Sequence, residues 1–201
     1  MGTIYSFFEI VPFGYFFLSA TLFLIAIYIA PAVVEKEVTF LLWYPRKMRW
    51  FMEKLLARKM PIVFIFLLIF TLNNLSLFSS FIAGFIVIGP FLSAFLTGMN
   101  VAIVSYEMMG WQGVWQILVN PVAWLEFPAA WLSFAMGIKL AVVTLSGGWN
   151  SAVQEFELLL PYYLKLVVLL LFVAGILETA LIRIMERFQP PDDHNNNDTS
   201  S

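Results

Sequence analysis

The chain has 201 residues, of which 61% are hydrophobic and 12% charged, and its formal net charge is −2. A soluble domain of this size does not need so much apolar sequence, so the composition indicates a single membrane domain. The small net charge implies no nucleic-acid partner. The absence of cysteine excludes disulfides, thiolate metal sites and cysteine nucleophiles. Because His194 is the single histidine, we also expect no histidine-based metal site and no cofactor.

The first apolar run predicts a transmembrane helix. Residues 1–11 are expected to form a short extracytoplasmic amino terminus, and the run from Pro12 to Val34 is long enough to cross the ~30 Å hydrocarbon core. Ala30-Pro31-Ala32 resembles a signal-peptidase site. No basic stretch precedes the run, however, and the run is longer than a typical signal core, which favours a retained helix.

Residues 35–60 form a basic segment whose apolar residues recur at spacings close to those of an amphipathic helix. Short basic loops stay cytoplasmic, so this segment predicts the topology. We expect it to lie on the inner leaflet, with aromatic side chains inward and cations toward the headgroups. Two interpretations of this segment remain open: it only sets the topology, or it also binds a specific lipid or partner. The predicted inner-leaflet contacts are Arg46, Lys47, Arg49, Lys54 and Arg58.

The rest of the chain predicts four further spans, at 61–88, 91–106, 127–145 and 161–181. Gly89-Pro90 is expected to form an outer turn, and Gly98 with Ala102 predicts close helix contact. Residues 151–160 are expected to form a short outer amphipathic helix before Pro161 starts the last span. The transmembrane domain then covers 12–188 and is followed by a disordered polar tail at 189–201. This protein of the cell membrane would have its amino terminus outside and its carboxyl terminus in the cytoplasm.

The stretch from Asn120 to Leu140 combines two prolines and two charged residues with apolar sequence. Pro121 and Pro128 each remove a backbone donor and disfavour helix just before them, so they predict two helix breaks. Backbone freed in this way must be buried in protein or line a wet cavity. We therefore predict an all-α, polytopic bundle of about five spans, packed around a broken or re-entrant segment.

Five polar side chains within the spans are candidates for an intramembrane site: Asn73, Asn74, Glu126, Lys139 and Glu178. Charges within spans are costly and usually face the bundle interior. Glu126 and Glu178 are expected at similar depths, whereas Lys139, ~20 Å further along a helix, would lie nearer the asparagines. Three interpretations remain open. The residues hold the bundle together, with Glu126 satisfying the broken backbone; they form a conduction or substrate site; or they act as a protonation switch.

Several motifs between Leu72 and Ala180 resemble the stage II sporulation protein M family of integral membrane proteins. The matching residues are Asn73-Asn74 followed by Gly84 and Pro90, Thr97-Gly98-Met99-Asn100, Pro121, Glu126, Pro128, Ala129, Lys139 in Met136-Gly137-Ile138-Lys139, and Glu178. The chain has Val122-Ala123 where the family has a His-Gly pair, so no role of that histidine is carried over.

The resemblance implies a membrane scaffold or assembly protein, because the sporulation member is a scaffold in a peptidoglycan-remodelling complex. Its partners would be the lipid bilayer and other membrane or envelope proteins, with a homo-oligomer also open. The alternative is a small permease or transporter subunit that uses Glu126, Lys139 and Glu178. The sequence contains no phosphate-binding loop, zinc-protease motif or nucleophile elbow, so we expect no enzyme.

Overall fold

Helices make up the regular structure of residues 2–56 and 61–188, which are the residues that the computed structural model describes. The first three are α1 (Gly2–Ile10), α2 (Phe13–Glu35) and α3 (Thr39–Leu56). Pro12 precedes α2 directly, as its fixed φ and missing N–H allow. α2 is the predicted first span, whereas α1 is an additional short helix that buries Phe7 completely.

The remaining helices contain four more passes. They are α4 (Ile62–Ile82) with the 3-10 turn η1 (Ala83–Ile86), α5 (Gly89–Val119), α6 (Ala123–Tyr162), the π-helical η2 (Tyr163–Val167) and α7 (Val168–Phe188). The described residues hold four helical runs long and apolar enough to cross a membrane, and the last of them, Ala123–Ile184, has 62 residues. A straight helix of that length would measure ~93 Å, about three times the hydrocarbon thickness.

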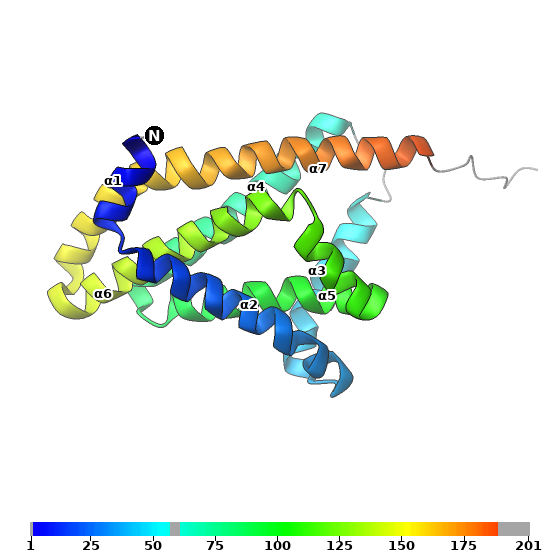
Figure 1. Ribbon diagram of the computed structural model, residues 1–201, viewed down its shortest axis with the longest axis horizontal. Coiled ribbons are helices and arrows are strands. Elements are labelled where there is room, and N and C mark those ends of the chain that lie inside the picture. The colour runs from blue at the N-terminus through cyan, green and yellow to red at the C-terminus, as the bar shows by residue number, and fades with distance from the viewer. Residues whose placement is uncertain (1, 57–60, 189–201) are drawn as a thin grey trace, which may run out of the picture.

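This long run is a hairpin because it bends at Gly148, where φ is 72° and ψ is −172°. Figure 1 shows the yellow part of α6 turning back so that α7 runs alongside the bundle. The hairpin contributes two passes, and the three preceding runs contribute one each. The prediction of an all-α membrane bundle with about five spans is therefore confirmed at the level of the fold.

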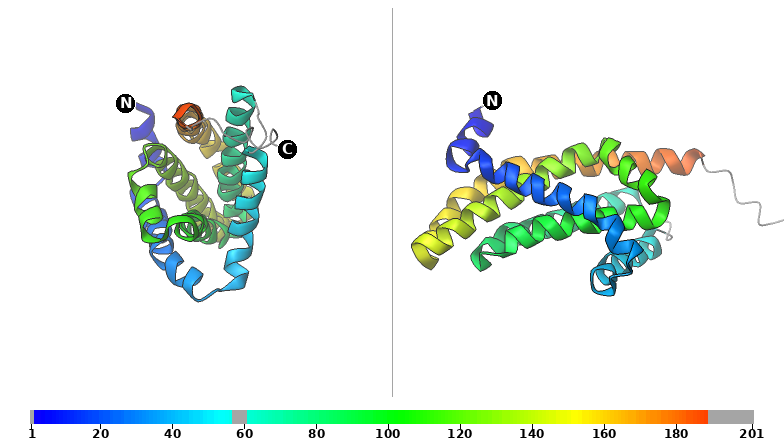
Figure 2. Two further views of the ribbon diagram at one scale, coloured as in Figure 1. Left: turned by 90° about the vertical axis from the view of Figure 1, so that its right-hand side faces the viewer. Right: turned by 60° about the horizontal axis from the view of Figure 1, so that its bottom comes forward.

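Small residues bring the central helices into close contact. A Cβ atom added to Gly98 would clash with the carbonyl oxygen of Phe23, so the backbones of α5 and α2 touch there. Ala102, one turn further along α5, is fully buried. Figure 2 shows α2, α5 and the first arm of α6 side by side, and their contacts agree. The close packing predicted from Gly98 and Ala102 is confirmed.

The broken segment is present, but only one of its two predicted proline breaks is correct. α5 ends at Val119, Asn120 is extended with ψ 123°, and α6 starts at Ala123, which confirms the break at Pro121. Pro128 lies inside α6, so the break predicted there is wrong. Its missing N–H affects a carbonyl close to the start of α6, where a helix bends more easily than it breaks.

The second break lies on the other side of Pro121, at Met109 and Gly110. Gly110 has φ 59° and ψ −146°, a conformation that glycine adopts without steric cost. Residues 111–119 consequently form a separate helical arm between two breaks. The irregular segment therefore precedes Glu126 instead of surrounding it.

The outer part of the last hairpin also differs from the prediction. Residues 151–160 belong to the second arm of α6, and Pro161 lies inside that arm and does not begin a span. Pro161 lacks one helical N–H, and the i→i+5 turns of Tyr163–Val167 come two residues later.

The turn between α4 and α5 lies just before the predicted Gly89-Pro90 position, since α5 starts at Gly89 and Val87 has a positive φ of 42°. The predicted tail at 189–201 and Arg58 lie outside the described residues.

Candidate functional site

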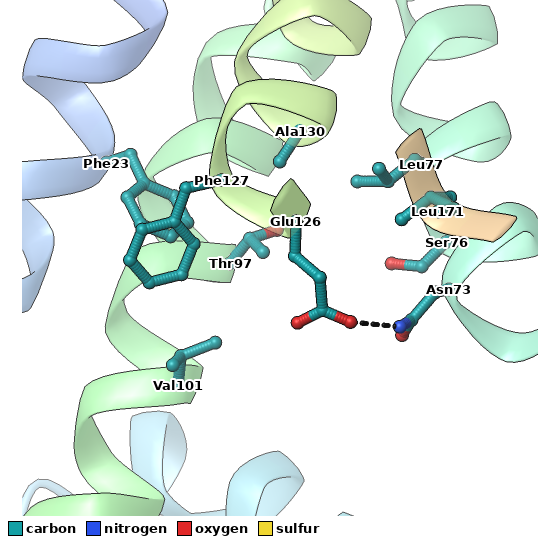
Figure 3. Close-up of a pocket in the computed structure, with 10 residues that line it drawn as sticks. All are labelled: Phe23, Asn73, Ser76, Leu77, Thr97, Val101, Glu126, Phe127, Ala130 and Leu171. Atoms are coloured by element: carbon teal, nitrogen blue, oxygen red, sulfur yellow. Dashed lines mark hydrogen bonds between the residues drawn. The ribbon is translucent and has the colours of Figure 1, made fainter. Parts of the chain in front are cut away.

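The intramembrane carboxylate of Glu126 is held by an amide from another helix. Glu126 lies in the first turn of α6, immediately after the break at Asn120 and Pro121. The side-chain Nδ2 of Asn73, on α4, donates a hydrogen bond of 2.7 Å to Glu126 Oε1 (Figure 3). A hydrogen bond to an ionised group in a low-dielectric interior is stronger than one between neutral groups. The bond therefore ties α4 to the start of α6.

A cavity of about 110 Å³ adjoins this carboxyl group. Its polar lining consists of Asn73, Ser76, Thr97 and Glu126, and apolar side chains from α2, α4, α5, α6 and α7 complete it. In Figure 3 one carboxylate oxygen of Glu126 meets Asn73, while the other points into the open space on the side of Val101. The cavity is large enough for several water-sized groups. It therefore leaves one face of the carboxylate open to a small ligand.

Glu178, on α7, is the second carboxylate at this end of the bundle. It is half-buried, and its charge acts on Glu126. Among the side chains that the structure describes, those of residues 3–54 and 61–184, neither carboxylate has a Lys or Arg nitrogen within 4.0 Å. Two carboxylates therefore influence each other without a basic partner among the described side chains.

One of the sequence interpretations assumed that Glu126 bonds the backbone groups freed at the break. The structure gives these groups other partners. The Val122 N–H donates to the side-chain oxygen Oδ1 of Asn120 at 2.9 Å, and the Trp124 N–H donates to the Asn120 carbonyl at 3.3 Å. This local turn is typical of asparagine, whose side chain bonds the backbone two residues later. The Glu126 carboxylate is thus available for contacts between helices.

The adjacent asparagines have different partners. Asn74 Nδ2 donates to the Phe70 carbonyl of its own helix at 2.9 Å, and the Tyr163 hydroxyl donates to the Asn74 carbonyl at 3.1 Å. Neighbouring residues of a helix point about 100° apart, so both amides cannot face the same partner. Only Asn73 of the predicted pair belongs to the Glu126 site.

Lys139 lies in a separate pair. Its Nζ is 4.0 Å from Glu155 Oε1, with side-chain exposures of 25% and 15%, and the contact joins the two arms of α6. The prediction that Lys139 lies near the asparagines is wrong, because Asn73 contacts Glu126 instead. Glu155 was missed as its partner. A sequence signal existed: Lys139 and Glu155 lie at similar distances before and after the Gly147-Gly148 pair, as expected for opposite positions of a hairpin.

A third charged group fixes α3 to α5. Arg46 Nε and Arg49 Nη1 donate to the two carboxylate oxygens of Glu107 at 2.6 and 3.2 Å, and the Glu107 side chain is only 10% exposed. Both arginines were expected at the lipid headgroups, and the structure gives them a protein partner. Glu107 was not predicted as a site residue, although it is the acidic residue closest before the Gly110 break.

Lys47 and Lys54 remain on the outward face of α3. Their ammonium groups lie 4.8 Å and 4.9 Å from the ring centroids of Trp43 and Trp50, and both tryptophans are more than half exposed. These four residues, which we call the Trp-Lys stripe, repeat at helical spacing. Cation–π contacts of this kind leave the ammonium hydrogens free for another group.

The fold and the site together define an all-α, multi-pass membrane protein with an acidic cavity inside its helix bundle. No family model matches the chain, and neither curated proteins nor solved structures give a match. The similarity to the stage II sporulation protein M family therefore stays a prediction from the sequence motifs. Among the described residues there is no group of three or more His, Cys, Asp or Glu side chains that could hold a metal ion.

Proposed function

We propose that the protein is a non-enzymatic membrane scaffold that holds α3 at one membrane face for a partner protein. The observation that supports this proposal is the attachment of α3. Arg46 and Arg49 both bond Glu107, while the opposite face of the same helix stays uncovered. A helix bound only by its lipid-facing side would not need this fixed contact with the bundle.

The uncovered face of α3 has the composition of a recognition surface. Phe40, Trp43 and Trp50 are 88%, 62% and 57% exposed, and Lys47 and Lys54 flank the tryptophans. Aromatic residues dominate the energetics of many protein interfaces because they bury a large area with little loss of side-chain entropy. The resemblance to a family with a scaffold member is in keeping with this role.

Site-specific photocrosslinking in cells tests the scaffold. A photoreactive amino acid at Phe40 or Trp43 should give discrete protein adducts, whereas the same group at Ile86 or Leu145, each 72% exposed, should not. Glu107→Gln should weaken the α3 adducts, because it removes the charge that holds Arg46 and Arg49. Adducts to lipid alone, or protein adducts unaffected by Glu107→Gln, would count against the proposed platform.

We also propose that α3 lies at the cytoplasmic face of the cell membrane, with the amino terminus outside and the carboxyl terminus inside. The basic composition of 35–60 supports this orientation. Because the chain has no cysteine, single cysteines report topology without background labelling. An impermeant maleimide should label Ser151→Cys in intact cells but not Phe40→Cys. The reverse pattern would invert the orientation.

A permease or transporter subunit is the second candidate, and the acidic cavity favours it. Glu126 lines a cavity inside the bundle without a Lys or Arg partner among the side chains that the structure describes, as an ion-binding residue would, and the charge of Glu178 acts on it. Flux of small ions across vesicles that contain the purified protein would test this role. A flux that Glu126→Gln abolishes, in a variant that still folds, would promote the permease over the scaffold.

A further inference from the structure

Charge inside the bundle is balanced at two places and unbalanced at a third. Glu107 has two arginines, and Lys139 has Glu155. Among the described side chains, Glu126 has only the neutral amide of Asn73 as a hydrogen-bond partner. The charged group that acts on it electrostatically is another carboxylate, Glu178. An ionised carboxylate in a membrane interior is costly unless it is paired. The missing positive charge must therefore come from outside the described chain.

The cavity beside Glu126 presents oxygen atoms from three helices. Asn73 and Ser76 come from α4, Thr97 from α5 and Glu126 from α6. The Asn73 Nδ2 already bonds Glu126, and the four remaining side-chain oxygens have no hydrogen-bond partner among the described residues: Asn73 Oδ1, Ser76 Oγ, Thr97 Oγ1 and the second carboxylate oxygen of Glu126. In Figure 3 these side chains line one space around the carboxyl group.

Carboxylate, amide and hydroxyl oxygens are the ligands of hard cations. The cavity offers one carboxylate and three neutral oxygens, with a second carboxylate further away. Ca²⁺ takes six to eight oxygen ligands, often from several carboxylates, and Mg²⁺ requires a near-ideal octahedron. A single carboxylate in contact matches a single positive charge better than a double one.

We propose that this cavity binds one monovalent alkali-metal cation, which neutralises Glu126 and links α4, α5 and α6. Glu126, Asn73, Ser76 and Thr97 supply the oxygens, and water completes the shell in the remaining volume. Glu178 increases the local negative potential without contacting the cation. The cation site does not depend on whether the chain is a scaffold or a permease, because the claim concerns binding and not flux.

Thermal unfolding of the full chain in detergent tests the site. N-methylglucamine chloride keeps the ionic strength constant while Na⁺, K⁺, Li⁺ or Rb⁺ replaces it. We expect at least one alkali cation to raise Tm with the logarithm of its concentration above Kd, by about 3–6 °C at ten times its Kd. Glu126→Gln should abolish the shift. The matched control Glu155→Gln removes a carboxylate that is also half-buried but is paired with Lys139, and it should keep the shift.

Two milder variants test the same site if Glu126→Gln fails to fold. Ser76→Ala and Thr97→Val leave every charge in place, and each should raise the cation Kd, measured by equilibrium dialysis, severalfold. Equilibrium dialysis with radioactive Na⁺ or Rb⁺ should find about one ion per chain. The inference is overturned if no alkali cation differs from N-methylglucamine, if wild type and Glu126→Gln shift equally, or if acidification alone reproduces the full stabilisation.

Discussion

Glu126 and Lys139 lie on the same arm of α6, yet the bundle treats their charges differently. Lys139 has an acidic partner, Glu155, on the returning arm of its own hairpin. Glu126 has an amide partner on α4, an open cavity and a second acid nearby. A charge that only links helices is expected to have its counter-charge built into the chain. A charge without a built-in counter-charge, such as that of Glu126, can instead be neutralised by a bound ion.

The difference follows from where each residue lies relative to the chain breaks. The Gly147-Gly148 bend brings residues on either side of it together, so that Lys139 meets a residue from the same helical run. Glu126 follows the break at Pro121, and the described residues that line the cavity beside it come from distant helices and include no basic one. Four sets of substitutions can break or sharpen this comparison.

The largest effect is expected at Gly137, which lies between the two charged positions. A Cβ atom there would be 2.9 Å from the Ser80 carbonyl oxygen and 2.9 Å from Pro90 Cβ. Gly137→Leu should push α6 away from α4 and destabilise the protein by about 3 kcal/mol. Gly14→Leu is the control, because nothing lies within 4 Å of a Cβ at Gly14. Similar unfolding midpoints for the two variants would contradict this close contact.

A smaller loss is expected when one partner of the Lys139 pair is removed. Glu155→Gln or Lys139→Met leaves the other charge unpaired, but both side chains keep some exposure and are 4.0 Å apart. We therefore expect about 1–2 kcal/mol, well below the cost for a fully buried pair. The double variant Lys139→Met/Glu155→Gln should be more stable than the sum of the single effects predicts. Strict additivity in the double-mutant cycle would show that the two residues do not interact.

The two asparagines provide a matched pair at the other end of the arm. Asn73→Leu removes the bond to Glu126, so we expect a loss of about 1 kcal/mol, near the middle of the range for hydrogen bonds between membrane helices. Asn74→Leu removes a bond to its own helix and should cost only a few tenths of that. Thermal unfolding of both variants in the same detergent gives the comparison. Equal losses would mean that the Asn73–Glu126 bond does not hold α4 to α6.

The smallest effect is expected for Glu126→Gln measured without alkali cations. Glutamine keeps an oxygen that accepts from Asn73 and removes an unpaired charge, so stability should change by less than about 0.5 kcal/mol or rise. Glu155→Gln under the same conditions should cost more, because it strands Lys139. If Glu126→Gln proves the more damaging of the two, Glu126 has a cationic partner within the chain and the comparison fails.

Local sequence determined much of the fold. Apolar runs of sufficient length predicted the spans, and Pro12 and Pro121 marked places where helices begin or end. The spacing within 35–60 predicted an amphipathic helix, which is α3. Each of these features depends on the residues of a single segment. Hydrophobic length and the restricted φ of a proline at a helix start act before any other helix has packed.

Tertiary structure alone decided which breaks persist and which charges meet. Pro128 and Pro161 stay inside helices, whereas Gly110 and Gly148 provide the bends, because packing sets where the chain must turn and glycine tolerates a positive φ there. Counting residues estimates depth along one helix, but it gives neither the rotation of that helix nor its neighbours. The contacts of Asn73 with Glu126, of Lys139 with Glu155, and of Arg46 and Arg49 with Glu107 follow from how the helices pack.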